Sequence, residues 1–210
     1  MKITYRTLGF AATNTYYIEK DNEVIVVDPC LDPNRDATRL LQPLKGKEVI
    51  AVLITHGHFD HISGIDAVVD RFNCPVYMYH EEIHYLKNPR VNLSNQVPEE
   101  YIIEAEVTPI YLEPLDIGSF EFDVIKTPGH TSGSISFVLD NHVFDGDFIF
   151  EESVGRTDLP TGSMAALNEA IRDFVETYKG DMIILYPGHG NTTTLDEEIK
   201  RNYYVKQALK

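Results

Sequence analysis

The first half of the chain alternates between short apolar runs and segments with apolar residues at helical spacing. The apolar runs and alternations predict strands over residues 3–7, 16–18, 24–27, 49–54 and 76–79. Helical spacing predicts helices over residues 34–44 and 65–72. The run at 49–54 is apolar without alternation, which is typical of a central strand buried on both faces. The turn that follows this strand is therefore expected to be held rigidly.

The second half repeats this order of elements. Strands are predicted at residues 120–124, 135–139 and 143–144, and a buried strand at 182–186. A helix is predicted over residues 167–178, with Ser163 or Thr161 as its cap, and a final helix over 196–209. Strands, then a helix, then a strand, twice over, favour an α/β fold with two β-sheets packed face to face and helices outside.

The segment between these halves allows more than one interpretation. His80 and His84 are four residues apart on a predicted helix and could form a metal pair, but their acidic flanks favour an ordinary solvated helix. Residues 87–105 have no clean periodicity and are predicted to be a long loop. This loop either forms a wall of a substrate pocket, with Arg90 and Asn92 contacting the substrate, or is a surface connection.

The turn after residue 54 concentrates side chains that bind metals. His56, His58, Asp60 and His61 lie within six positions, although the whole chain has only eight histidines. Chance or packing explains such a cluster poorly. Imidazole and carboxylate donors suit zinc, iron or manganese, whereas calcium and magnesium prefer oxygen donors alone. The sequence therefore predicts a metal centre here.

These four residues form the motif His-x-His-x-Asp-His, which resembles the signature of the metallo-β-lactamase superfamily. Further pieces follow in the expected order: His130 in Thr-Pro-Gly-His, Asp147 in Asp-Gly-Asp and His189 in Pro-Gly-His-Gly. The resemblance covers nearly the whole chain. It implies one domain over residues 1–210 with a four-layer αββα sandwich, that is, two mixed β-sheets flanked by helices. It also implies that Asp28 orients the metal ligands, although an aspartate before a proline could simply begin a turn.

The resemblance implies a site with two divalent metal ions. His56, His58 and His130 would bind one ion, Asp60, His61 and His189 the other, and Asp147 would bridge them. Zinc is favoured, and iron or manganese is also compatible. Three protein ligands for each ion leave a position open for water, and a water shared by two cations can become a bridging hydroxide nucleophile near neutral pH. Asp60 and Asp147 are predicted to be the catalytic residues.

The motifs also bear on the substrate. They include no separate strong general acid, so a thiolate, whose parent thiol has a pKa of ~8.5, is a better leaving group here than an amine. Asp147 stands where related β-lactamases carry a cysteine ligand, which disfavours antibiotic hydrolysis. Residues 155–160 resemble the small bacterial glyoxalase II-like hydrolases and, in part, the persulfide dioxygenases. A thioesterase acting on S-acylglutathione or another S-acyl thiol is therefore the predicted function.

Three details qualify this comparison with glyoxalase II. Only 21 residues follow His189, whereas the full-length enzyme adds a helical domain that contacts glutathione. Lys126 stands where relatives often place histidine. Arg156 and Asp158 are expected to pair and brace the metal-bearing loop rather than bind substrate.

Two other functions remain as alternatives. One is a mononuclear iron persulfide dioxygenase, with the ion on His56, His130 and Asp147. The other is a non-enzymatic metal-binding module. That reading is disfavoured because a structural site closes with four ligands, whereas seven candidates over two ions imply open positions.

Composition narrows the partners. A net charge of −15 argues against a nucleic-acid partner, since such binding draws on clustered Lys and Arg. The sequence shows neither a secretory signal nor an apolar run of membrane-spanning length, so a soluble cytoplasmic protein with a small-molecule substrate is expected. Cys30 and Cys74 cannot form a disulfide scaffold and are expected to be buried or turn thiols.

Overall fold

Two six-stranded mixed sheets form the framework of the protein. The computed structural model describes residues 1–210 as two compact units. The first unit comprises Met1–Tyr111 and Asp116–Phe120, and the second Leu112–Leu115 and Glu121–Lys210. The predicted α/β class with two mixed sheets flanked by helices is therefore confirmed. The assignment of the chain to a single domain remains a prediction.

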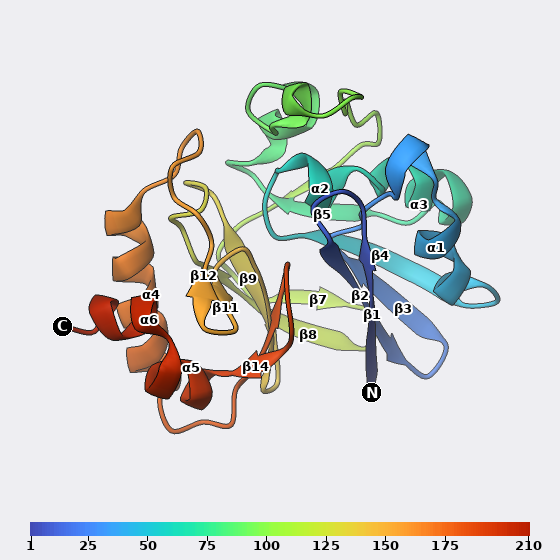
Figure 1. The fold of residues 1–210 in the computed structure, drawn as a ribbon. Coiled ribbons are helices and arrows are strands. Elements are labelled where there is room, and N and C mark those ends of the chain that lie inside the picture. Colours follow the sequence, from blue (N-terminus) through green and yellow to red (C-terminus); the bar gives the residue numbers. More distant parts are fainter. The chain divides into compact units, whose positions relative to one another are not determined.

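The sheet of the first unit has the strand order β1-β2-β3-β4-β5-β6 (Figure 1). Its strands are β1 (Lys2–Leu8), β2 (Thr13–Lys20), β3 (Glu23–Val27), β4 (Glu48–Ile54), β5 (Val76–Tyr79) and β6 (Thr108–Ile110). β1, β2 and β3 pair antiparallel, whereas β3, β4, β5 and β6 pair parallel. The carboxyl ends of β3 and β4 therefore lie at the same edge of this sheet.

Helices α1 (Thr38–Leu41), α2 (Phe59–Ile62) and α3 (Ile65–Phe72) belong to the first unit, with 3-10 segments at Pro33–Arg35, Gln42–Leu44, Ile83–Lys87 and Ser94–Gln96. The helix predicted over 34–44 is present only as α1 between two 3-10 segments. Asn34 is left-handed (φ 62°), and Pro43 has no amide hydrogen with which to continue an α-helix. Leu40 of α1 and Val68 of α3 are buried in the same apolar cluster as alternate residues of β3 and β4.

The sheet of the second unit has the order β14-β13-β10-β9-β8-β7. Its strands are β7 (Leu115–Ile117), β8 (Phe120–Lys126), β9 (Ile135–Leu139), β10 (His142–Gly146), β13 (Ile184–Pro187) and β14 (Thr193–Thr194), and a separate hairpin joins β11 (Ile149–Phe150) to β12 (Ser153–Val154). β10 and β13 pair parallel. The strand predicted from residue 182 begins at Ile184, and the Met182 side chain is exposed rather than part of a buried strand.

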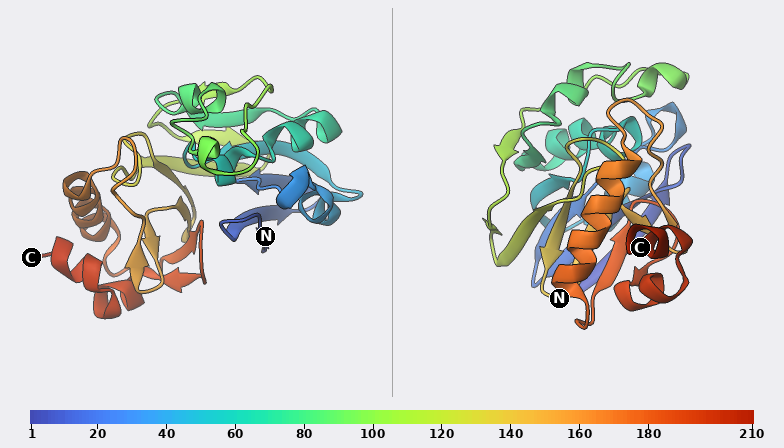
Figure 2. Two further views of the ribbon diagram at one scale, coloured as in Figure 1. Left: turned by 45° about the horizontal axis from the view of Figure 1, so that its top comes forward. Right: turned by 90° about the vertical axis from the view of Figure 1, so that its left-hand side faces the viewer.

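Helices α4 (Met164–Tyr178), α5 (Leu195–Arg201) and α6 (Tyr203–Ala208) complete the second unit (Figure 2). Ser163 caps α4 as predicted, since its Oγ accepts a hydrogen bond of 3.2 Å from the Ala166 amide. Apolar residues of α4, α5 and α6 share one buried cluster with β9, β10 and β13. The single helix expected at the end of the chain is divided at Asn202, which has an extended backbone and caps α6. No helix has the length and apolar character needed to cross a membrane.

Both cysteines are free and buried, as the sequence suggested. Burial raises the pKa of the Cys30 thiol to about 12, with a smaller contribution from the charge of Asp60. Cys30 is therefore a neutral thiol in the interior of the first unit.

Candidate functional site

Asp28 connects β3 to the metal-binding motif that follows β4. Its amide donates to the Leu53 carbonyl at 3.0 Å, which reflects the parallel pairing of the two strands. Its carboxylate accepts hydrogen bonds from the Thr55 amide (2.8 Å) and hydroxyl (2.7 Å), and it lies 2.8 Å from Nδ1 of His61. The geometry thus supports the orienting role over a simple turn, because a bond at Nδ1 fixes the His61 ring and directs Nε2 elsewhere.

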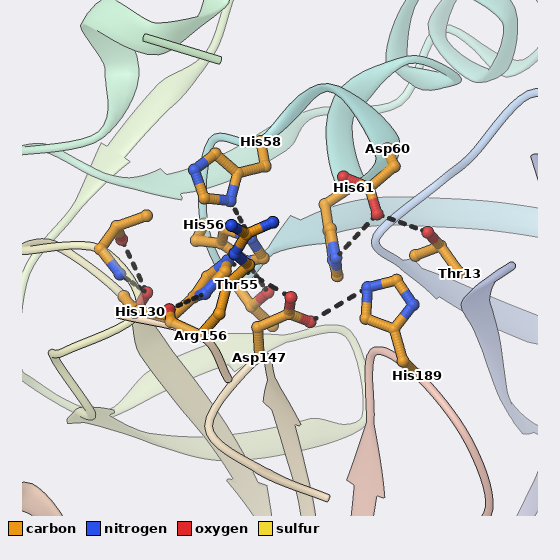
Figure 3. A network of polar contacts seen from close by, with 12 residues as sticks. Thr13, Thr55, His56, His58, Asp60, His61, His130, Asp147, Arg156 and His189 are labelled. Carbon is orange, nitrogen blue, oxygen red and sulfur yellow. Dashed lines mark hydrogen bonds and ion pairs between the residues drawn. The ribbon is translucent and has the colours of Figure 1, made fainter. Parts of the chain in front are cut away.

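The four side chains of the motif are buried together in the first unit (Figure 3). His56 Nε2 lies 3.1 Å from His58 Nδ1, and Asp60 Oδ2 lies 3.4 Å from His61 Nε2. The ring centroids of His56 and His61 are 4.1 Å apart. Burying three imidazoles and a carboxylate is costly unless their polar atoms are satisfied, which is the environment that a metal ion would provide.

Thr13, at the start of β2, holds the carboxylate of this group. Its Oγ1 donates a hydrogen bond of 2.6 Å to Asp60 Oδ2, and the residue is fully buried (Figure 3). Thr13 was not among the predicted site residues. The only available signal was a polar residue at the start of an apolar strand.

The other three candidates lie at one edge of the second sheet. β10 and β13 are parallel, and β8 runs in the same direction because β9 is antiparallel to both β8 and β10. His130, Asp147 and His189 each follow the carboxyl end of one of these strands. His130 Nε2 lies 3.3 Å from Asp147 Oδ2, and His189 Nε2 lies 3.4 Å from Asp147 Oδ1 (Figure 3). One oxygen of Asp147 therefore faces each imidazole.

Residues 155–158 support His130. The Arg156 carbonyl lies 2.8 Å from His130 Nδ1, so this nitrogen donates to it and Nε2 faces Asp147. The Arg156 guanidinium makes two hydrogen bonds of 2.7 and 2.8 Å to Asp158 and lowers the pKa of that carboxyl to about 2. The predicted pairing is confirmed. Position 155 requires glycine, because a Cβ there would lie 2.0 Å from the Asp147 carbonyl oxygen.

Asp145 is a further carboxyl beside this cluster, and it faces the interior. It is buried, and its Oδ2 accepts a hydrogen bond of 3.2 Å from the Ile149 amide. Burial raises the pKa of Asp145 well above its ordinary value. The hydrogen bond from the Ile149 amide to Asp145 thus stabilises the turn from β10 to β11.

The spacing of donor atoms within each unit fits metal ligands. The four donor pairs described above lie 3.1, 3.4, 3.3 and 3.4 Å apart. Tetrahedral zinc with bonds of about 2.0–2.1 Å places neighbouring ligand atoms about 3.3 Å apart. Imidazole with carboxylate is also a donor set that suits zinc, iron or manganese.

The segment after β5 differs from its prediction in two respects. His80 and His84 are exposed, and only His84 lies in the 3-10 helix, so the two histidines do not lie on one helix as the metal-pair interpretation assumed. The predicted substrate contact of Asn92 is wrong. Its side chain is fully buried and its Nδ2 donates to the carbonyls of Tyr85 and Tyr101. Arg90 is exposed, and its contact with a substrate stays a prediction.

The family model of the metallo-beta-lactamase superfamily matches residues 8–190. The chain belongs to this superfamily. A probable metallo-hydrolase of Streptococcus pyogenes is 38% identical to this superfamily member over 213 aligned positions, which cover 96% of this chain and 89% of that protein. The resemblance drawn from the motif is confirmed at this level.

Solved structures agree with the metallo-beta-lactamase fold. The BLEG-1 B3 metallo-beta-lactamase has a TM-score of 0.89 at 33% identity, with 97% of this chain and 99% of that chain covered. A di-iron-bound form of TTHA1623 has a TM-score of 0.84 at 28% identity, with 96% and 99% covered. The general prediction of a metal-dependent hydrolase with this fold agrees with these relatives.

Proposed function

We propose that this protein is a dinuclear metal-dependent hydrolase of small thioesters, with S-acylglutathione or a related S-acyl thiol as substrate. In this proposal His56, His58 and His130 would hold one ion, Asp60, His61 and His189 would hold the other, and Asp147 would contact both. The proposal is supported by the position of Asp147, which directs one oxygen toward His130 and the other toward His189.

Two bound divalent ions would polarise the substrate carbonyl and activate a water molecule as nucleophile. Zinc is the proposed metal, and iron or manganese would suit the same donors. The di-iron form of a similar structure supports the inclusion of iron. Asp60 and Asp147 are the proposed catalytic carboxylates. Thr13 would keep Asp60 in position through its short hydrogen bond.

The carboxyl groups of Asp28 and Asp145, beside the candidate ligands, support thioesters as the substrate class. Asp28 is engaged by Thr55 and His61, and Asp145 is enclosed by the protein as it holds the Ile149 amide. Neither is available to protonate a leaving group. A thiol, with a pKa of ~8.5, can leave as its anion, whereas an amine requires a proton. The site therefore suits thioesters better than amides.

A second candidate is hydrolysis of β-lactams, which the similarity to a B3 metallo-beta-lactamase favours. The bond broken in a β-lactam is an amide, and its nitrogen must gain a proton on departure. The engaged states of Asp28 and Asp145 therefore rank this activity below thioester hydrolysis.

The test measures thiol release from S-lactoylglutathione by protein loaded with zero, one or two equivalents of zinc, iron or manganese. Turnover is expected to peak at two equivalents, with kcat/KM at least about 100-fold above that of the matched amide, a difference of about 2.7 kcal/mol in activation free energy. A chromogenic cephalosporin and glutathione persulfide with oxygen are assayed in parallel. Thioester turnover absent at every loading would refute the proposal. Activity confined to the cephalosporin would support the second candidate, and oxygen uptake by iron-loaded protein would support a mononuclear persulfide dioxygenase.

We also propose a small-molecule substrate rather than nucleic acid or a membrane, supported by the net charge of −15. A cytoplasmic location remains the expectation from the sequence.

A further inference from the structure

Two main-chain amides of the metal-binding motif are held by one segment, the chain that follows β5. The Gly57 amide donates a hydrogen bond of 2.9 Å to Glu82 Oε2. The Phe59 amide donates one of 2.8 Å to the Asn92 carbonyl. Gly57 and Phe59 alternate with the proposed ligands His56, His58 and Asp60. The amides of Gly57 and Phe59 are thus both held by acceptors in the segment that follows β5.

The backbone at Gly57 is also in close contact with this segment. A Cβ at position 57 would lie 2.4 Å from the Cβ of Tyr85, so no other residue fits without movement of the chain. The Tyr85 amide donates to the Glu82 carbonyl at 2.9 Å, and its carbonyl accepts from Asn92 Nδ2 at 2.9 Å. We call Glu82, Tyr85 and Asn92 the loop support, because they form one hydrogen-bonded group against the motif.

Glu82 is the unusual member of the loop support. The sequence suggested a solvated helix at this point, yet Glu82 is fully buried because the 3-10 turn directs it toward the motif. Burial of a carboxylate is costly unless strong hydrogen bonds compensate for the lost water. A neutral glutamine would also accept the Gly57 amide at that position. A charge at Glu82 therefore offers little to the fold alone.

A carboxylate offers two advantages to a metal site. It accepts a stronger hydrogen bond than an amide oxygen does, so the turn between His56 and His58 is held more firmly. Its negative charge also complements the positive charge of an ion on those imidazoles. Both effects act through the Gly57 amide and the local field.

We propose that Glu82 is a positioning residue that fixes the His56-Gly57-His58 turn through the Gly57 amide, so that both imidazoles are preset for the same metal ion. The inference rests on the proposed function in one respect, that His56 and His58 are ligands of one ion. Glu82 acts through this turn and does not itself contact substrate.

The test compares Glu82→Ala and Glu82→Gln with the wild type. Zinc affinity is measured by competition with a chromophoric chelator, and ligand geometry by the visible absorption of the cobalt(II) protein. Glu82→Ala is expected to weaken the binding of one ion by about 10–100-fold and to alter the cobalt spectrum. Glu82→Gln keeps an acceptor for the Gly57 amide, so a smaller loss of about 2–10-fold is expected.

Leu44→Ala is the control for a general loss of stability, because Leu44 is a fully buried residue of the apolar core in the same unit. This variant should unfold at lower denaturant concentration with unchanged zinc affinity. Wild-type affinity in Glu82→Ala, a loss no larger than that of Leu44→Ala, or equal losses in the Ala and Gln variants would each overturn the proposal. If Glu82→Ala does not fold, wild-type affinity and spectrum in Glu82→Gln would overturn it. Failure of the wild type to bind zinc, iron or manganese would instead reject the proposed function, and this inference with it.

Discussion

Asp28 and Thr13 show how single polar residues can determine the geometry of the candidate ligands in the first unit. The Asp28 carboxylate accepts hydrogen bonds from the amide and the hydroxyl of Thr55, and it contacts Nδ1 of His61. Thr13, at the start of β2, donates a hydrogen bond to the Asp60 carboxylate. His61 and Asp60 are thus oriented by contacts with the protein, which reduces the rearrangement needed when an ion binds.

At the scale of single residues, we predict that Asp28→Asn disturbs the orientation of the His61 ring. The amide nitrogen of asparagine is a donor, so one of its two polar atoms cannot accept from Thr55 or His61 as the carboxylate does. Zinc affinity is expected to fall about 10–100-fold, as measured by chelator competition. Asp66→Asn is the control, because Asp66 also accepts main-chain amides, those of Glu104 and Ala105, in the same unit. Equal affinities in the two variants would contradict the orienting role.

The candidate ligands could be predicted from the sequence because histidines cluster in one turn and the remaining pieces follow in a known order. Their supports could not. Thr13 is 47 residues from Asp60, and Glu82 is 25 residues from Gly57. Sequence spacing does not predict such contacts, since they depend on strand pairing and on the 3-10 turn that follows Glu82. Glu82 was misassigned for this reason.

Among the elements, the β11–β12 hairpin after Asp147 is tied to the C-terminal helices through Asn202. Asn202 Nδ2 donates to the carbonyls of Phe150 (3.3 Å) and Ser153 (2.7 Å) and to Glu198 (2.9 Å). Its Oδ1 accepts from the Tyr204 and Val205 amides in the first turn of α6. One side chain therefore joins the hairpin to both α5 and α6.

We predict that Asn202→Ala lowers the free energy of unfolding by about 2–4 kcal/mol, because it removes a helix cap and leaves two partly buried carbonyl groups and buried Glu198 without this donor. Urea denaturation measures the change. Asn191→Ala provides the control, since Asn191 is exposed and donates to exposed Glu151, and its effect should stay within about 0.5 kcal/mol. A loss below 1 kcal/mol for Asn202→Ala would show that the junction adds little stability.

Long buried elements were predictable from the sequence, and short or interrupted ones were not. β4, β9 and α4 carry clear apolar patterns and lie close to their predicted positions. Strands β6, β7, β11, β12 and β14 have only two or three residues, too few to show a periodicity. The helices predicted over 34–44 and 196–209 were too long, because Pro43 and Asn202 interrupt them.

For the whole molecule, the candidate ligands follow strand ends and are brought into position only when the sheets fold. Ions that bind the folded protein and not the unfolded chain would therefore stabilise the native state. The ions would also offset part of the net charge of −15.

Removal of metal is accordingly predicted to lower the thermal stability. A single ion at 100 times its Kd contributes about 2.7 kcal/mol. Loss of one such ion corresponds to a Tm about 5–10 °C lower for a chain of this length, and loss of a second ion adds to this decrease. Calorimetry of chelator-treated protein, before and after zinc is restored, measures the effect. An unchanged Tm would mean that the ions do not stabilise the folded state.

The buried thiol of Cys30 affects which metal ions the protein can bind. A cysteine coordinates soft cations such as cadmium or copper(I) through its deprotonated sulfur, and a pKa of about 12 keeps Cys30 protonated near neutral pH. A sulfur atom close to Asp60 thus stays chemically silent. The Cys30 thiol is therefore not expected to compete with the nitrogen and oxygen donors of the candidate site for a metal ion.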